Sequence, residues 1–153
     1  MKTEYEINPS TIAIISIEKN LTKVIEVERE FFVENSSLKI IDNSCKFFGS
    51  SYEGRFEGTK NLTGIANKSP IIIEESKNII FFPTASPRRD YCNWISLNKI
   101  DNYKRSGTKT ILKFTNNYHL ELNMSFESLE NQILRATRLD AILRKRKNFE
   151  LEK

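Results

Sequence analysis

The chain has 153 residues with 39% hydrophobic and 29% charged side chains, a size that favours one domain around a single core and excludes a large multidomain enzyme. No apolar run approaches the roughly 18 residues that cross a bilayer, and the N-terminus lacks a signal-peptide pattern, so we expect a cytoplasmic protein. The formal charge of +4 combines a net −3 over residues 1–76, with 9 basic and 12 acidic side chains, and a net +7 over residues 77–153, with 15 basic and 8 acidic.

Most of the chain consists of short β-type runs separated by turn residues, which is the pattern of an antiparallel or mixed sheet. The predicted strands are Thr11–Ile17, Thr22–Val27, Glu30–Val33, Lys39–Ile41, Lys46–Phe48, Ile71–Ile73, Asn78–Phe82, Tyr91–Leu97, Thr110–Phe114 and Tyr118–Asn123. Asn116-Asn117 separates the last two strands and indicates a hairpin turn.

Residues 49–58 hold three of the five glycines, and we predict that they form turns. Gly49–Phe56 nearly fits a phosphate-binding loop, but Arg55 stands where the phosphate lysine belongs and Phe56 lacks the magnesium-binding hydroxyl. A nucleotide-binding enzyme with a degenerate Gly49–Arg55 loop therefore stays as an alternative. Backbone amides, the Tyr52 hydroxyl and the Arg55 guanidinium would also suit a phosphate or a nucleic-acid groove.

Two further basic segments follow in the second half of the chain. Arg88 and Arg89 lie between Pro87 and Asp90 in a loop that proline would stiffen, with a solvated Arg/Asp pair as the simpler interpretation. A later cluster either lines one edge of the sheet or forms a solvated face; it comprises Lys99, Lys104, Arg105, Lys109 and Lys113. A basic half of this kind is typical of proteins with a polyanion partner, and it also fits plain solubility.

The C-terminal segment is the one clear helix, predicted over about residues 125–147. Ser125 is the expected N-cap, and apolar residues recur at the three-and-four spacing of a buried stripe: Leu129, Ile133, Ala136, Leu139, Ile142 and Leu143. Arg144–Lys147 would lie at the negative end of the helix dipole. We therefore predict an α+β fold, a predominantly antiparallel or mixed β-sheet core with a C-terminal amphipathic helix. If the apolar stripe instead docks a partner, the chain is an oligomeric protein-interaction module.

Catalytic and metal-binding patterns are weak throughout. Ser50, Ser51 and Cys45 have no histidine nearby in the sequence, and His119 is the single histidine of the chain. The two cysteines, Cys45 and Cys92, do not show the close spacing of metal ligands. We therefore expect no enzyme activity, no metal and no cofactor, with both cysteines as reduced core residues.

Residues 44–59 resemble the ComK family of competence transcription factors. The likeness continues in the same order through Lys68, Pro70-Ile71, Phe82-Pro83-Thr84, Ser86, Arg88, Cys92, Trp94-Ile95-Ser96, Ser128, Glu130-Asn131-Gln132 and Arg135. It covers most of Ser44–Arg135. The resemblance implies an activator of genes for DNA uptake that binds double-stranded promoter DNA at paired A/T-rich boxes, through the minor groove and as a homo-oligomer.

Read with this resemblance, residues 1–153 form a single DNA-binding domain. Its candidate DNA-binding residues are Lys46, Ser50, Ser51, Tyr52, Arg55, Arg88, Arg89, Lys104 and Arg105. The narrow minor groove of A-tracts attracts arginine, which favours Arg55, Arg88 and Arg89 for groove or phosphate contact. The implied partners include RNA polymerase, no membrane is expected, and the location is the cytoplasm, in association with the nucleoid. Longer family members extend past the helix, so adaptor-mediated proteolysis is not carried over to this chain.

Overall fold

The computed structural model of the protein describes residues 1–151. Its strands are β1 (Thr11–Glu18), β2 (Leu21–Glu26), β3 (Glu30–Val33), β4 (Ile71–Glu74), β5 (Ile79–Pro83), β6 (Trp94–Ser96), β7 (Ile100–Ser106), β8 (Lys109–Phe114) and β9 (His119–Leu122). Its helices are α1 (Ser37–Phe47), α2 (Tyr52–Thr63) and α3 (Phe126–Leu151), with a short 3-10 turn at Leu97–Lys99.

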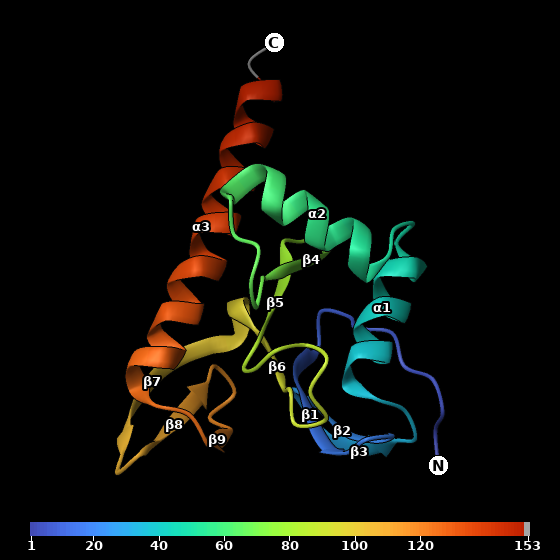
Figure 1. The fold of residues 1–153 in the computed structure, drawn as a ribbon, viewed down its shortest axis with the longest axis vertical. Helices are drawn as coiled ribbons and strands as arrows, with labels where there is room; N and C mark the ends of the chain where they lie inside the picture. The colour runs from blue at the N-terminus through green and yellow to red at the C-terminus, as the bar shows by residue number, and fades with distance from the viewer. Residues whose placement is uncertain (152–153) are drawn as a thin grey trace.

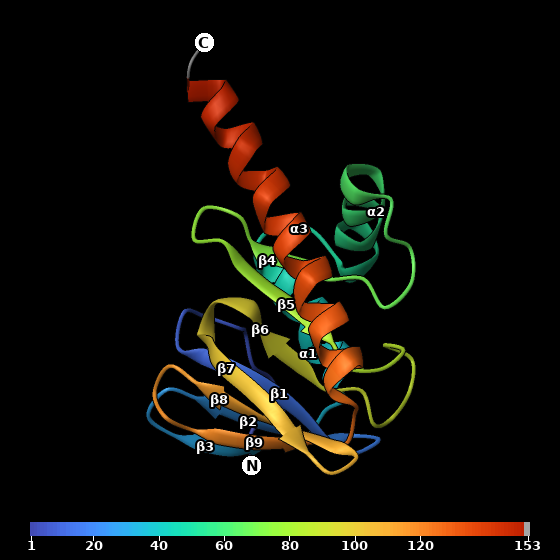
Figure 2. The ribbon, with the colours of Figure 1, turned by 90° about the vertical axis from the view of Figure 1, so that its left-hand side faces the viewer.

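The strands form two antiparallel sheets. The larger has the order β3-β2-β1-β6-β5-β4, and the smaller has the order β7-β8-β9. Figures 1 and 2 show α1 and α2 on one side of the larger sheet and the smaller sheet with α3 on the other. The predicted α+β fold with an antiparallel core and a C-terminal helix is confirmed.

The larger sheet is buried on both faces, so two hydrophobic clusters form. Phe81 of β5 packs with Ile40 and Trp94 in the cluster beneath α1 and α2. Its neighbour Phe82 points the other way and packs with Phe114 and Leu139 beneath α3. Because successive strand residues face opposite sides, a central strand covered on both faces consists of apolar residues without interruption.

Two predicted strands are wrong, since Lys39–Ile41 lies in α1 and Lys46–Phe48 comprises the last two residues of α1 and its C-cap. The buried positions of α1 include Ile40, Ile41, Ser44 and Cys45, a three-to-four-residue repeat that makes one helix face. The run Lys39–Ile41 contains two positions of this stripe, Ile40 and Ile41, whereas Lys46–Phe48 is exposed at the end of the helix. The Ser36 hydroxyl caps α1 by accepting the Lys39 amide at 3.2 Å.

The prediction of turns over Gly49–Gly58 is also wrong beyond residue 51, where α2 begins. The Ser51 hydroxyl accepts the Gly54 amide at 3.0 Å and caps α2, and Gly64 ends the helix with a left-handed φ of 79°. The helix buries Thr59 and packs Tyr52 and Phe56 on the sheet. Tertiary packing therefore outweighs the low helix propensity of its two glycines.

In the C-terminal half, two predicted elements are confirmed and one strand was not predicted. The hairpin at Asn116-Asn117 is confirmed, and Asn117 adopts a left-handed φ of 68°. Strand β7 was not predicted, because this edge strand exposes charged and polar side chains over most of its length. The helix is confirmed, with the Ser128 amide donating to the Ser125 hydroxyl at 3.1 Å, but it continues four residues past the predicted end, to Leu151.

Candidate nucleic-acid interface

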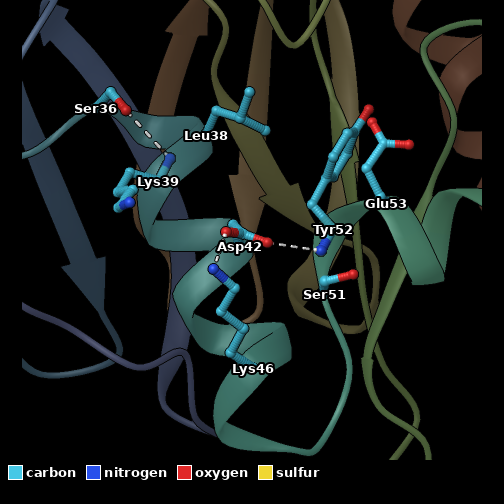
Figure 3. A pocket seen from close by; sticks show the side chains of 8 residues that line it. All are labelled: Ser36, Leu38, Lys39, Asp42, Lys46, Ser51, Tyr52 and Glu53. Atoms are coloured by element: carbon cyan, nitrogen blue, oxygen red, sulfur yellow. Dashed lines mark hydrogen bonds and ion pairs between the residues drawn. The ribbon is translucent and has the colours of Figure 1, made fainter.

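Three adjoining cavities lie where the start of α1, the start of α2 and the loop between β5 and β6 converge. The first, of about 430 Å³, is lined by Ser36, Leu38, Lys39, Asp42, Lys46, Ser51, Tyr52 and Glu53 (Figure 3). The second, of about 340 Å³, shares Tyr52 and Glu53 and adds Phe56, Ala66, Asn67, Lys68, Ser86, Pro87 and Arg88. The third, of about 200 Å³, shares Ser36 and Leu38 with the first and Pro87 and Arg88 with the second, and adds Ser16, Lys19, Asn20, Ser37, Arg89 and Asp90. We call this surface the three-cavity face.

Asp42 joins the two helices at the first cavity. Its Oδ1 accepts the Tyr52 amide at 2.9 Å, and its Oδ2 lies 3.0 Å from the Lys46 ammonium (Figure 3). Burial raises the pKa of this carboxyl, but the bonds from the Tyr52 amide and Lys46 outweigh burial and hold the pKa below its ordinary value. An ionised carboxylate therefore already occupies the N-terminus of α2.

This geometry argues against a nucleotide loop at Gly49–Arg55. A phosphate loop keeps the amides before its helix open for the ligand. Here the Tyr52 amide is bound by Asp42 and the Gly54 amide by the Ser51 hydroxyl, so the segment presents a negative charge where a phosphate would bind.

Tyr52 stands at the boundary of the first and second cavities. Its ring meets the buried Trp94 edge-on, with 6.2 Å between ring centroids, and lies the same distance from Phe56. Burial and the nearby Glu53 charge raise the pKa of the Tyr52 phenol to about 12, against the opposing effect of Arg88. The phenol thus stays protonated and offers a hydroxyl donor beside Arg88.

Arg88 and Arg89 lie on a loop that the fold holds in place. The Arg89 amide donates to the Ser86 carbonyl at 3.0 Å, and the Cys92 amide returns to the Arg89 carbonyl at 3.1 Å. The Ser37 hydroxyl at the start of α1 donates to the Cys92 carbonyl at 2.8 Å. Within residues 1–149 neither arginine forms an ion pair, Asp90 included, so both exposed guanidinium groups face outward on a braced loop.

Arg55 lies one turn after Tyr52 on α2 but lines none of the three cavities. It is half-buried, and its Nε is buried with no hydrogen-bond partner in the described part of the chain. Burial raises the pKa of the Cys45 thiol to about 12, with the Arg55 charge acting against that shift. Arg55 therefore lies near Cys45 of α1 and outside the three cavities.

Lys104 and Arg105 lie on β7 of the smaller sheet, away from α1 and α2 (Figure 1). The Arg105 guanidinium is paired with Glu127 and lies 4.5 Å from the centre of the Phe126 ring. Ser50 precedes α2, donates its amide to the Cys45 carbonyl at 3.0 Å and does not line the cavities. The structure thus brings Lys46, Ser51, Tyr52, Arg88 and Arg89 together and leaves the other four candidates outside.

The three-cavity face also contains three cations that are not among the predicted DNA-binding residues, namely Lys19, Lys39 and Lys68. Lys68 has a left-handed φ of 48° and follows α2 in a loop that touches α3. The resemblance to the ComK family, which includes Lys68, was the one feature of the sequence that could have identified it as a site residue. Nothing in the local sequence indicates that Lys68 lies near Arg88.

The described residues contain no group of three or more His, Cys, Asp or Glu side chains that could hold a metal ion. No helix within residues 1–151 is long and apolar enough to cross a membrane.

A family model described as ComK protein matches residues 2–148 of the chain. The chain is also 39% identical over 159 residues to a protein of Bacillus subtilis (strain 168) named Competence transcription factor, and the match covers 96% of this chain and 83% of that protein. No solved structure matches the chain.

Proposed function

The chain belongs to the ComK family, and on that premise we propose that it binds A/T-rich promoter DNA through the minor groove and activates genes for competence. In this proposal the whole chain is one DNA-binding domain, and the three-cavity face is its contact surface. A homo-oligomer and RNA polymerase are the further partners that the family resemblance suggests.

The proposal rests on Arg88 and Arg89, which are exposed and form no ion pair with the described side chains. A narrow A-tract minor groove concentrates negative potential, and arginine side chains enter it for that reason. The loop is bonded to α1 through Ser37 and Cys92. Its backbone therefore loses little conformational freedom when the two guanidinium groups bind DNA. Their position beside the protonated Tyr52 hydroxyl adds a donor for the acceptor atoms that A·T pairs show in the minor groove.

The charge of the face supports a polyanion as its ligand. Six cations line the three cavities: Lys19, Lys39, Lys46, Lys68, Arg88 and Arg89. Three carboxylates oppose them, and one of these, Asp42, is already paired with Lys46. In this proposal the remaining cations bind phosphates on the two sides of the groove. Such phosphate contacts position a protein on the duplex, while contacts to the base edges in the groove select the sequence.

The other predicted residues take different roles in this proposal. Ser51 caps the first turn of α2, Ser50 precedes this turn, and Arg55 follows Tyr52 on the same helix, so in this proposal they act on DNA through the position of Tyr52. Lys104 and Arg105 lie on the other sheet, and they reach DNA as a separate contact, on a second duplex segment or within an oligomer.

The test is binding of Arg88→Ala to an A/T-rich and to a G·C-rich duplex at fixed salt, with footprinting in the presence of a minor-groove ligand. We expect a loss of about 1–3 kcal/mol on the A/T-rich duplex and displacement by the ligand. Lys109→Ala is the control, because it removes one charge on β8 that is paired with Glu121 at 3.3 Å. Equal binding by Arg88→Ala and wild type, or major-groove protection, would contradict the proposal.

A further inference from the structure

Helix α3 continues beyond the hydrophobic core, which holds it as far as Leu143. Its buried apolar positions are Leu129, Ala136, Leu139 and Leu143, and Leu143 is the last of them among the described side chains. Figures 1 and 2 both show the C-terminal end of α3 extending past the rest of the protein. The core therefore explains the helix as far as Leu143 and no further.

The second half of α3 is strongly basic, and we call residues 138–147 its basic end. Residues 138–147 contain five cations, Arg138, Arg144, Lys145, Arg146 and Lys147, and one carboxylate, Asp140. Because the helix continues to Leu151, its last turn contains no basic residue. The helix dipole acts mainly within that last turn, so it does not explain this cluster.

Local contacts account for two of the five cations. Arg144 pairs with Asp140 at 2.9 Å, and the Lys147 ammonium donates to the Glu75 carbonyl at 2.6 Å. Arg138, Lys145 and Arg146 are exposed and meet no acidic partner among the side chains of residues 1–149. These three charges are available to a partner outside the chain.

The middle of α3, directly before its basic end, is joined to the three-cavity face by hydrogen bonds. Gln132 of α3 donates to the Lys68 carbonyl at 3.0 Å, and the Arg135 guanidinium donates to the Asn67 carbonyl. Asn67 and Lys68 line the second cavity together with Arg88. Arg138 follows Arg135 by three residues and Lys145 follows Arg138 by seven, so all three lie on one side of the helix.

We propose that the basic end of α3 binds the phosphate backbone of the same duplex, outside the A/T-rich box held by the three-cavity face; this inference rests on the proposed function. From Gln132 to Arg146 the helix rises by about 21 Å at 1.5 Å per residue, which corresponds to roughly six base pairs at 3.4 Å each. The apolar stripe of α3 is buried in the core, and Phe149 is the one apolar residue among residues 144–149. This described part of the helix therefore lacks the hydrophobic face that a membrane-surface helix needs.

The experiment compares the double variant Lys145→Gln/Arg146→Gln with wild type on two duplexes, one ending at the A/T-rich box and one extended by about ten base pairs on each side. Binding is followed by fluorescence anisotropy over a range of salt concentrations. Each released phosphate contact contributes about 0.9 to the slope of log affinity against log salt. We expect the variant to reduce that slope by up to about 1.8 on the long duplex and to leave it unchanged on the short one.

Lys109→Gln/Lys113→Gln is the matched control, since it removes two charges that Glu121 and Asp101 already pair on the smaller sheet. Circular dichroism verifies that both double variants keep their helix content. A wild-type slope for the α3 variant on the long duplex, or the same reduction on both duplexes, would overturn this inference alone. Failure of wild type to bind either duplex would overturn the proposed function as well.

Discussion

Gln132 is the side chain that holds α3, β5 and the loop before β4 together. It is 4% exposed, and its amide nitrogen donates to two backbone carbonyls, that of Pro83 at 2.7 Å and that of Lys68 at 3.0 Å. Its amide oxygen accepts from the Arg135 guanidinium at 2.6 Å. Gln132→Met keeps a similar volume and removes the donors, so this variant isolates the hydrogen bonds from the packing.

The structure sets the size of the effect. The Pro83 carbonyl is in a buried bond, and leaving such an acceptor unsatisfied costs about 1–3 kcal/mol. The Lys68 carbonyl is only partly buried and can bind water in the variant. The stability lost there is therefore the net contribution of one hydrogen bond, about 0.5–1.5 kcal/mol. We expect Gln132→Met to lower the free energy of unfolding by about 2–4 kcal/mol.

Urea unfolding followed by circular dichroism measures this change. With a denaturant slope of about 2 kcal/mol/M for a domain of this size, the midpoint should fall by roughly 1–2 M. Asn131→Met is the control, because the adjacent Asn131 is exposed and its replacement should change stability by no more than about 0.5 kcal/mol. A loss below about 1 kcal/mol for Gln132→Met would refute the assignment of Gln132 as a structural link.

Two further predictions concern the stability of the fold. Gly64→Ala forces a side chain into the left-handed end of α2 at φ 79° and should cost about 1–2 kcal/mol; an unchanged urea midpoint would contradict the strain. Burial raises the pKa of the Glu26 carboxyl, but hydrogen bonds from Tyr5 and Arg29 hold it below the ordinary 4.5. The stabilisation from Glu26 is therefore complete above that value and is lost as the pH falls through the lower, folded-state pKa. Glu26→Gln should remove this part of the acid destabilisation, and equal acid sensitivity in variant and wild type would contradict it.

Periodic patterns in the sequence were sufficient for the elements that are long or strongly alternating. The stripe from Leu129 to Leu143 predicted α3 and its cap at Ser125. The Asn116-Asn117 pair predicted the β8–β9 hairpin, because asparagine tolerates the left-handed backbone of a tight turn. In both cases local chemistry and tertiary packing favour the same structure.

Local patterns failed where packing outweighed propensity. The β-type triplet Lys39–Ile41 lies in α1, because Ile40 and Ile41 join Ser44 and Cys45 on one buried helix face. Residues 52–63 form α2 despite Gly54 and Gly58, because Tyr52, Phe56 and Thr59 pack on the sheet. A window of a few residues contains no information about the surface on which it will pack.

The sequence by itself determined the α+β class, the C-terminal helix, the basic second half and the family. Only the tertiary structure decided which cations lie together: it places Arg88 and Lys68 at one cavity, links Lys68 to α3 through Gln132, and leaves Arg105 paired with Glu127 at the smaller sheet. It also showed that Arg144–Lys147 are not end caps, because α3 continues to Leu151. The physical reason is that composition and periodicity depend on neighbours in the chain, whereas a binding surface depends on distances between segments that only the packed core determines.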